Sequence, residues 1–309
     1  MSSKTPSWND LRIFLEVART GTLSGAATKL KVDHSTISRH IAQLELAIDA
    51  PVFERDSQGF HITPRGRDLI EYVEAMEASA LQLNDAIGGK LRTPSGSVRI
   101  ATMEGIASLY FSTQFIAFHQ RHPKIIIELV TSTQMVHVNQ READLFISFF
   151  PPEGKGLHVE PVGAFPLHLY AAPGYLAKHG TPQTLQELEQ HEFVSYIDDL
   201  IQLNTVRWLD EAILNPKVAF RSSSMIAQLF SAVDEAGIVM LPSFSRPERF
   251  GLVRLLHDQI DVKRTIWLTM RQNLRYLPRI KPVVAFLLEV LQRDCPLPPG
   301  IKPHTDALA

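Results

Sequence analysis

Residues 24–46 constrain the fold more than any other stretch, because two helical patterns follow one another there with almost no chain between them. The first begins after Ser24, has small residues on one side that permit close packing, and ends near Leu30. The second covers residues 34–46, and Asp33 before it is a good N-cap. Its apolar residues fall on one face, at Ile37, Ile41, Leu44 and then Ile48. Two short helices joined this tightly predict a helix-turn-helix.

The exposed first turns of the second helix carry the residue types that read DNA. Histidine and serine supply short donors and acceptors, arginine offers a planar cation for guanine or phosphate, and helix N-terminal amides attract phosphate. The residues predicted to contact DNA here are His34, Ser35, Thr36, Ser38 and Arg39. The alternative is a solvated helix face, because these residue types are also common on surfaces.

Elements on both sides of this pair complete a small domain. Ser7, followed three residues later by Asp10, can cap a preceding helix that Gly21 ends. On the other side, residues 51–66 alternate apolar and polar types around a Gln58-Gly59 turn, which predicts a hairpin wing.

The wing places two further cations, Arg55 and Arg65, where they could lie beside a bound duplex, although each could equally be an ordinary exposed charge. Residues 1–67 hold nine Lys/Arg and seven Asp/Glu, a balance of 9 − 7 = +2. That excess is too small to argue for DNA binding by itself. The case for DNA binding therefore depends on where the individual cations lie in the fold.

From Pro64 to Gly88-Gly89 the sequence is helical, with a narrow apolar stripe at heptad spacing and mostly Glu, Gln, Asn and Ala between. The stripe consists of Leu69, Val73, Met76, Ala80, Leu83 and Ile87. We predict that it pairs with the same helix of a second copy; packing within one chain is the alternative. Residues 88–96, GGKLRTPSG, are predicted to be a hinge.

After the hinge, short β-branched runs alternate with helical segments, which predicts an α/β module. The predicted strands lie at 98–101, 124–130, 144–149, 167–172, 192–197, 217–221 and 238–241. The predicted helices lie at 104–121, 133–142, 173–179, 203–213 and 223–236.

Composition and motifs exclude several classes of protein. A single cysteine, Cys295, rules out an intrachain disulfide and a cysteine zinc finger, and no stretch of about 18 apolar residues predicts a membrane span. The chain has no Walker A loop, no G-x-G-x-x-G after a strand, no H-E-x-x-H and no G-x-S-x-G. We therefore expect a non-enzymatic cytoplasmic protein with no cofactor, no metal and no membrane association.

The whole chain resembles the LysR-type transcriptional regulators. The most specific stretch is LRIFLEVARTGTLSGAATKLKVDHSTISRHIAQLELAIDAPVFERDSQGFHITPRG, and FHQRHPKIIIEL, READLFIS and GIVMLP follow in the family's order. The resemblance implies an N-terminal all-α winged helix-turn-helix domain and a C-terminal α/β regulatory domain like a periplasmic binding protein. That regulatory domain has two lobes joined by crossing strands, with an effector cleft between them.

The domain boundaries implied are 1–66 for DNA binding, 67–90 for the dimerisation helix, 91–96 for the hinge, 97–300 for the regulatory domain and 301–309 for a tail. Lobe one would hold 97–165 and 271–300, and lobe two 166–270, with crossings near 166–170 and 265–270.

By position, hydroxyl groups and neighbouring residues after strands resemble the family's effector contacts, although plain helix capping is an equal explanation. They are Thr102, Met103, Thr131, Ser132, Ser222, Ser223 and Ser224. Three residues depart from the family's pattern. Asp33-His34 replaces a common Ser-Gln, Ser148 replaces a frequent arginine, and Glu235 replaces the first glycine of a turn. The effector is therefore expected to be atypical or to lack strong negative charge.

The partners implied are double-stranded promoter DNA, a small-molecule effector, RNA polymerase and further copies of the chain, with dimers or the tetramers usual in the family. The location implied is the cytoplasm, in association with the nucleoid. An enzyme, a stand-alone solute-binding protein and a pure interaction module are the rival readings. The Asp33 to Arg39 turn beside the Arg55 hairpin argues against the interaction module, which needs neither feature.

Overall fold

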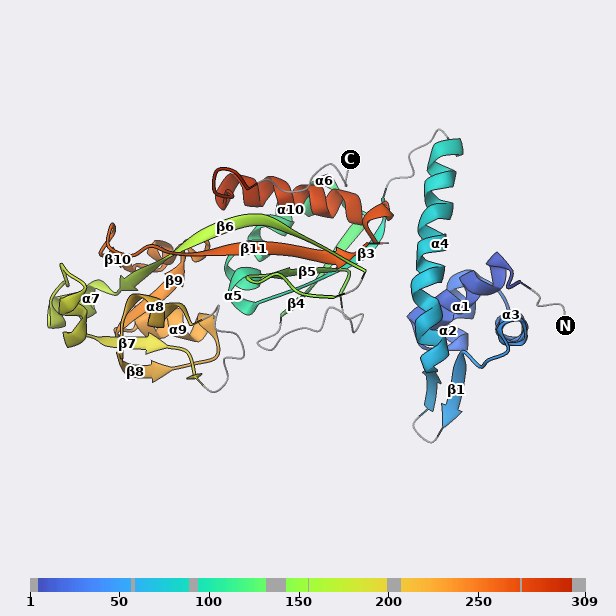
Figure 1. The fold of residues 1–309 in the computed structure, drawn as a ribbon, viewed down its shortest axis with the longest axis horizontal. Coiled ribbons are helices and arrows are strands. Elements are labelled where there is room, and N and C mark those ends of the chain that lie inside the picture. The colour runs from blue at the N-terminus through green and yellow to red at the C-terminus, as the bar shows by residue number, and fades with distance from the viewer. Residues whose placement is uncertain are drawn as a thin grey trace. The chain divides into compact units, whose positions relative to one another are not determined.

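The computed structural model describes residues 5–56, 59–88, 94–131, 143–154, 156–198, 207–272 and 274–301. Its contacts divide the chain into two compact units, Met1–Arg92 and Thr93–Ala309, each of which has its own fold (Figure 1). None of the described helices is long and apolar enough to cross a bilayer.

The first unit is a helical domain with a two-stranded hairpin. In chain order its elements are α1 (Trp8–Thr20), α2 (Leu23–Leu30), α3 (His34–Ile48), β1 (Phe53–Asp56), β2 (Gly59–Ile62) and α4 (Pro64–Gly88). The predicted first cap is confirmed, because the Ser7 side chain accepts a hydrogen bond from the Asp10 amide and Gly21 ends the helix in a left-handed conformation. The predicted hairpin also forms, although Gln58 lies outside the described residues.

The turn between α2 and α3 is as tight as the sequence predicts. Lys31 adopts a left-handed conformation with φ of 56°. Asp33 occupies the N-cap position of α3, but its side chain makes no capping bond, and its backbone carbonyl accepts from the amide of Thr36 instead. Helix α2 begins at Leu23, two residues earlier than predicted, because the Thr22 side chain accepts from the amide of Gly25.

One hydrophobic core holds the first unit together. Phe14, Ile37, Leu44 and Val73 are fully buried in it, and Leu69 is partly buried against it. The prediction that Val73 belongs to a seam facing a second copy is therefore wrong, since a side chain with 0% exposure in one chain has no surface to offer a partner. Heptad spacing cannot separate the two cases, because a helix packed on its own domain shows the same periodicity.

The second unit is built on one mixed sheet, in the order β4-β3-β5-β11-β6-β9-β7-β8, with β10 paired to β6 (Figure 1). The strands are β3 (Gly96–Thr102), β4 (Ile125–Thr131), β5 (Leu145–Ser148), β6 (Leu157–Ala171), β7 (Glu192–Ser195), β8 (Lys217–Arg221), β9 (Ile238–Pro242), β10 (Val253–Leu255) and β11 (Val262–Arg271). Strands β3, β4 and β5 are parallel and form lobe one, whereas β7, β8 and β9 are parallel and form lobe two.

Two long antiparallel strands, β6 and β11, join the lobes. Strand β11 pairs with β5 at one end, and β6 pairs with β9 at the other. Strand β6 begins at Leu157, ten residues before the predicted start at 167. Pro161, Gly163 and Pro166 interrupt the local β pattern, and the strand exists because it pairs with β11 across a bulge. The two predicted crossings, near 166–170 and 265–270, lie within β6 and β11.

Helices cover the sheet of the second unit. They are α5 (Glu104–Ile106), the π-helical segment η1 (Ala107–Phe111), α6 (Ser112–Arg121), α7 (Pro173–His179), α8 (Trp208–Ala212), α9 (Met225–Val233) and α10 (Ile280–Asp294). The predicted helix at 104–121 is confirmed as a run that contains the π-helical segment. The predicted helix at 133–142 and the start of the one at 203–213 lie outside the described residues.

Candidate DNA-binding and effector sites

Helix α3 presents two opposite faces. Ile37 and Leu44 are fully buried on one, whereas His34, Ser38 and Arg39 are exposed on the other. Ser35 is also exposed and Thr36 is half-buried. Within the described part of the chain, none of these five polar side chains has a hydrogen-bond or ion-pair partner. Their donors and acceptors are therefore free to meet an external partner.

A polar contact that the sequence analysis missed fixes α3 against α1. The His40 Nδ1 atom lies 2.6 Å from Asp10 Oδ1, and Asp10 Oδ2 accepts from the hydroxyl of Ser7 at 2.6 Å. The side chains of His40 and Asp10 are both largely buried. The contact joins residues 30 positions apart. Only the packing of α1 on α3 brings them together, so no local signal predicts it.

The wing is seated on the start of α4. Arg65 is exposed in the first turn of that helix. Next to it, Gly66 approaches the Val52 carbonyl so closely that a Cβ on Gly66 would lie 2.3 Å from that oxygen. In β1, Arg55 pairs through its backbone with Phe60, while its side chain lies outside the described part.

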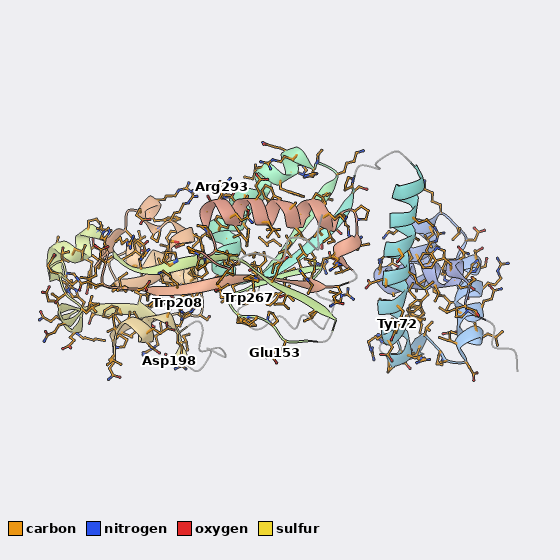
Figure 2. All side chains as sticks on the ribbon, turned by 45° about the horizontal axis from the view of Figure 1, so that its top comes forward. Tyr72, Glu153, Asp198, Trp208, Trp267 and Arg293 are labelled. Atoms are coloured by element: carbon orange, nitrogen blue, oxygen red, sulfur yellow. The ribbon has the colours of Figure 1, made fainter. Side chains whose placement is uncertain are left out.

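The outer surface of α4 carries apolar side chains beyond the part that packs in the core. Met76 is 45% exposed and Leu83 59%. Tyr72, which Figure 2 labels, is 70% exposed. A groove beside them is lined by Trp8, Ala75, Met76, Ser79 and Ala80. The sequence analysis missed Tyr72 and Trp8, because neither follows the heptad spacing. The side chain of Ile87 lies outside the described residues.

In lobe one, the predicted effector residues differ in how much surface they offer. Thr102 is 2% exposed, and its hydroxyl donates to the carbonyl of Ile147 at 2.9 Å. Met103 is half-buried, and Thr131 is exposed at the end of β4. Ser132 lies outside the described residues. The Thr102 hydroxyl proton is thus already used to join β3 to β5.

In lobe two, the serines before α9 form its N-terminal cap. The Ser222 hydroxyl accepts from the amide of Ser224, and the Ser224 hydroxyl accepts from the amide of Ala227, both at 3.1 Å. Ser223 is exposed. The Ser224 hydroxyl also donates to Glu104 Oε1 of lobe one at 3.1 Å. The sequence analysis missed Glu104, because residues 120 positions apart meet here only through the tertiary fold.

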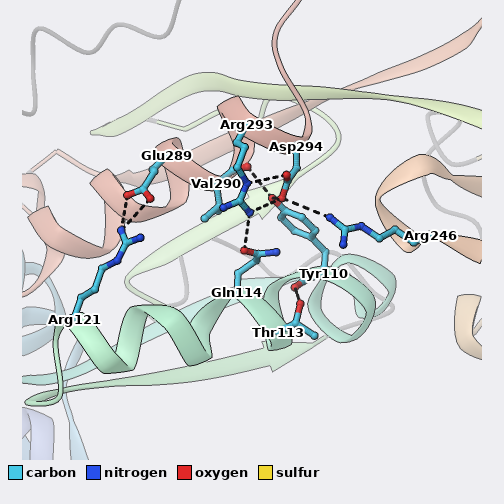
Figure 3. Close-up of polar contacts among 9 residues, drawn as sticks. All are labelled: Tyr110, Thr113, Gln114, Arg121, Arg246, Glu289, Val290, Arg293 and Asp294. Carbon is cyan, nitrogen blue, oxygen red and sulfur yellow. Dashed lines mark hydrogen bonds and ion pairs between the residues drawn. The ribbon is translucent and has the colours of Figure 1, made fainter. Parts of the chain in front are cut away.

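A second contact between the lobes lies at the end of α10 (Figure 3). Arg246 of lobe two lies 3.9 Å from the carboxylate of Asp294, which is also 2.9 Å from the hydroxyl of Tyr110. The neighbouring Arg293 guanidinium, bonded to the same carboxylate, holds the pKa of Asp294 below its usual value. Beside them, the ring of Phe244 packs on that of Tyr110.

Two of the residues that depart from the family's pattern have defined contacts in the structure. Ser148 is fully buried, and its hydroxyl donates to the carbonyl of Phe150 at 2.6 Å. Glu235 adopts the left-handed conformation, with φ of 67°, that a glycine takes at no steric cost. Its carboxylate accepts from Lys178 at 2.6 Å and fills the space left open by Gly174. The turn before β9 therefore forms without the glycine.

Comparison with known proteins agrees with this architecture. Residues 8–67 match the family described as bacterial regulatory helix-turn-helix protein, lysR family, and residues 91–292 match the LysR substrate binding domain. The chain is 27% identical to the HTH-type transcriptional regulator CrgA of Neisseria meningitidis over 65% of this chain and 67% of that protein. It is 26% identical to the regulator PtxR of Pseudomonas aeruginosa over 93% of each.

Solved structures share the fold. CrgA of Neisseria meningitidis aligns with a TM-score of 0.58 and 24% identity over 93% of this chain and 99% of that one. Full-length OxyR of Pseudomonas aeruginosa aligns with a TM-score of 0.70 and 14% identity over 94% of this chain and 95% of that one. With both family domains in the expected order, the chain belongs to the LysR family of transcriptional regulators, in which a helix-turn-helix domain binds DNA and a substrate-binding domain responds to a small-molecule effector.

Proposed function

We propose that the exposed face of α3 reads base edges in the major groove of promoter DNA. One observation carries the proposal: His34, Ser35, Ser38 and Arg39 point away from a well-packed core and have no partner within the described part of the chain. Thr36, Arg55 and Arg65 then contact the adjacent backbone. Footprinting on genomic fragments tests this function, and failure to protect any fragment at low salt would exclude it.

We further propose that two copies pair through α4. The exposed side chains of Met76 and Leu83, with Ala80 and the groove beside them, supply the apolar surface for a second copy. Leu69 and Ile87 mark the two ends of the proposed contact. A helix of 25 residues is roughly 37 Å long, which is long enough to separate two recognition helices. Sedimentation of a Leu83→Lys variant tests the pairing.

A tetramer needs a second surface, and the edges of the sheet offer one. The exposed apolar residues there are Ile116, Ile126 and Val130 near one edge, and Phe220 and Phe230 near the other. Strands β4 and β8 form these edges, and among the described strands each pairs on one side only, which leaves its outer side for a second copy. We propose that these edges join dimers into a tetramer.

The effector is proposed to bind between the lobes, with Met103, Thr131, Ser132 and Ser222 to Ser224 around it. The Thr102 side chain is proposed to shape lobe one rather than to touch the ligand. Binding changes promoter affinity only to the extent that the ligand prefers one arrangement of the dimer. The regulator then recruits or blocks RNA polymerase at the nucleoid in the cytoplasm, and it acts without catalysis. Transcription from a footprinted promoter, with purified polymerase, tests this step.

A further inference from the structure

Glu104 is an acidic side chain placed where the two lobes meet, and its two carboxylate oxygens have different surroundings. Oε1 accepts from the Ser224 hydroxyl at 3.1 Å. Oε2 is buried and has no hydrogen-bond partner within the described part of the chain. Such an oxygen is a strong acceptor that lacks a donor.

The contact around Glu104 is close. A Cβ on the neighbouring Gly105 would lie 2.3 Å from Met225 Sδ, so lobe one approaches α9 through a residue without a side chain. Ser224 caps α9, whose first amides carry partial positive charge. The Glu104 carboxylate therefore occupies the position at which an anionic ligand would meet this helix.

No cationic side chain among the described residues offsets the charge of Glu104. Within the described ranges no lysine or arginine forms an ion pair with it. Burial raises the pKa of nearby Tyr196, and the negative charge of Glu104 raises it further, so the phenol stays neutral.

Leaving a buried charged acceptor without a donor costs free energy, which a ligand that supplies the donor recovers. An ammonium or guanidinium group supplies it together with the opposite charge, which makes the hydrogen bond stronger. A carboxylate ligand would instead face a like charge and compete with Glu104 for the start of α9.

We propose that Glu104 selects the effector by charge, so that the ligand between the lobes carries an ammonium or guanidinium group that donates to Oε2. The proposal rests on the proposed function of the second unit as the effector domain. It names the chemical class of the ligand, and it excludes simple carboxylates.

Calorimetric titration of the full chain with putrescine, agmatine and succinate tests the proposal, because putrescine and succinate have equal carbon number and opposite charge. We expect saturable binding of at least one amine and none of succinate. The Glu104→Gln variant keeps an acceptor for Ser224 and removes the charge, and we expect its amine affinity to fall about tenfold or more. Glu104→Asp should retain part of the affinity.

Glu153→Gln is the matched control, since Glu153 is an exposed acid of lobe one (Figure 2). Thermal melts check that every variant folds. Binding of neither amine, amine affinity unchanged in Glu104→Gln, or succinate binding to the unmodified chain would each overturn the proposal. Failure of the proposed function gives a different result: amines bind through Glu104 but leave the affinity for a footprinted promoter unchanged.

Discussion

The polar residues that begin α3 and those that precede α9 are similar in kind but differ in their contacts. Ser38 and Arg39 of α3 are exposed and have no partner within the described part of the chain. Ser222 and Ser224 before α9 are bonded to backbone amides, and Ser224 is also bonded to Glu104. Substitution of a side chain without an intrachain partner should change binding, whereas substitution of a bonded or buried one should first change stability.

The largest expected effect tests this distinction within the first unit. Val73→Lys places a charge in a fully buried site and should destabilise the first unit by about 4 kcal/mol or more. Urea denaturation followed by circular dichroism measures the loss. Leu46→Lys, at a site of α3 that is 77% exposed and lies outside the proposed dimer contact, is the control and should leave the free energy of unfolding within about 0.5 kcal/mol. Equal losses in the two variants would break the comparison.

The next effect concerns DNA. Arg39→Ala should weaken promoter binding by about 10- to 100-fold and lower the salt slope by about one if the guanidinium contacts phosphate. Stability should not change, because Arg39 has no intrachain partner in the described structure. Fluorescence anisotropy at several salt concentrations measures both quantities. Arg121→Ala, which removes an exposed pair with Glu289, serves as the control. Unchanged affinity and slope would remove Arg39 from the DNA interface.

A smaller effect is expected at Thr102. Thr102→Val removes the hydrogen bond to Ile147 from a buried site and should lower the stability of the second unit by about 1 to 3 kcal/mol. Effector affinity should stay within about twofold, a difference of roughly 0.4 kcal/mol. Thermal melting measures the change in stability, and calorimetry with a bound effector measures the change in affinity. Loss of affinity without loss of stability would show that Thr102 contacts the ligand.

The smallest effect should be seen at Ser38. Ser38→Ala should change the ranking of operator variants by about 1 kcal/mol at one base position, because a short hydroxyl makes at most one base contact. Competition binding with single-base variants detects the change. Uniform weakening across all variants would instead assign Ser38 to the phosphate backbone.

Local patterns predicted most of the elements in the first unit. The serine cap of α1, the short turn after Leu30 and the amphipathic spacing of α3 all act within a few residues, so they are visible in sequence. In the second unit, short β-branched runs likewise predict the parallel strands. The predicted strand at 167–172 covers only the end of β6, because the first ten residues of β6 contain two prolines and a glycine and are maintained by pairing with β11.

The two candidate sites also differ in how far local sequence patterns predict them. The positions of the exposed polar face of α3 follow from helical periodicity alone. The meeting of Glu104 with Ser224 does not, because loop lengths and strand order bring together residues 120 positions apart.

By itself, the sequence determined the order of the parts: a winged helix-turn-helix, a long helix and an α/β regulatory domain. Periodicity, caps and turns are local, and they specify elements before any packing occurs. Only the tertiary structure decided which side chains remain free. In the folded chain Val73 is buried and the Thr102 hydroxyl is bonded to Ile147. One oxygen of Glu104 has no donor among the described residues. Burial and hydrogen-bond partners depend on residues that are distant in the chain, so the sequence alone does not give them.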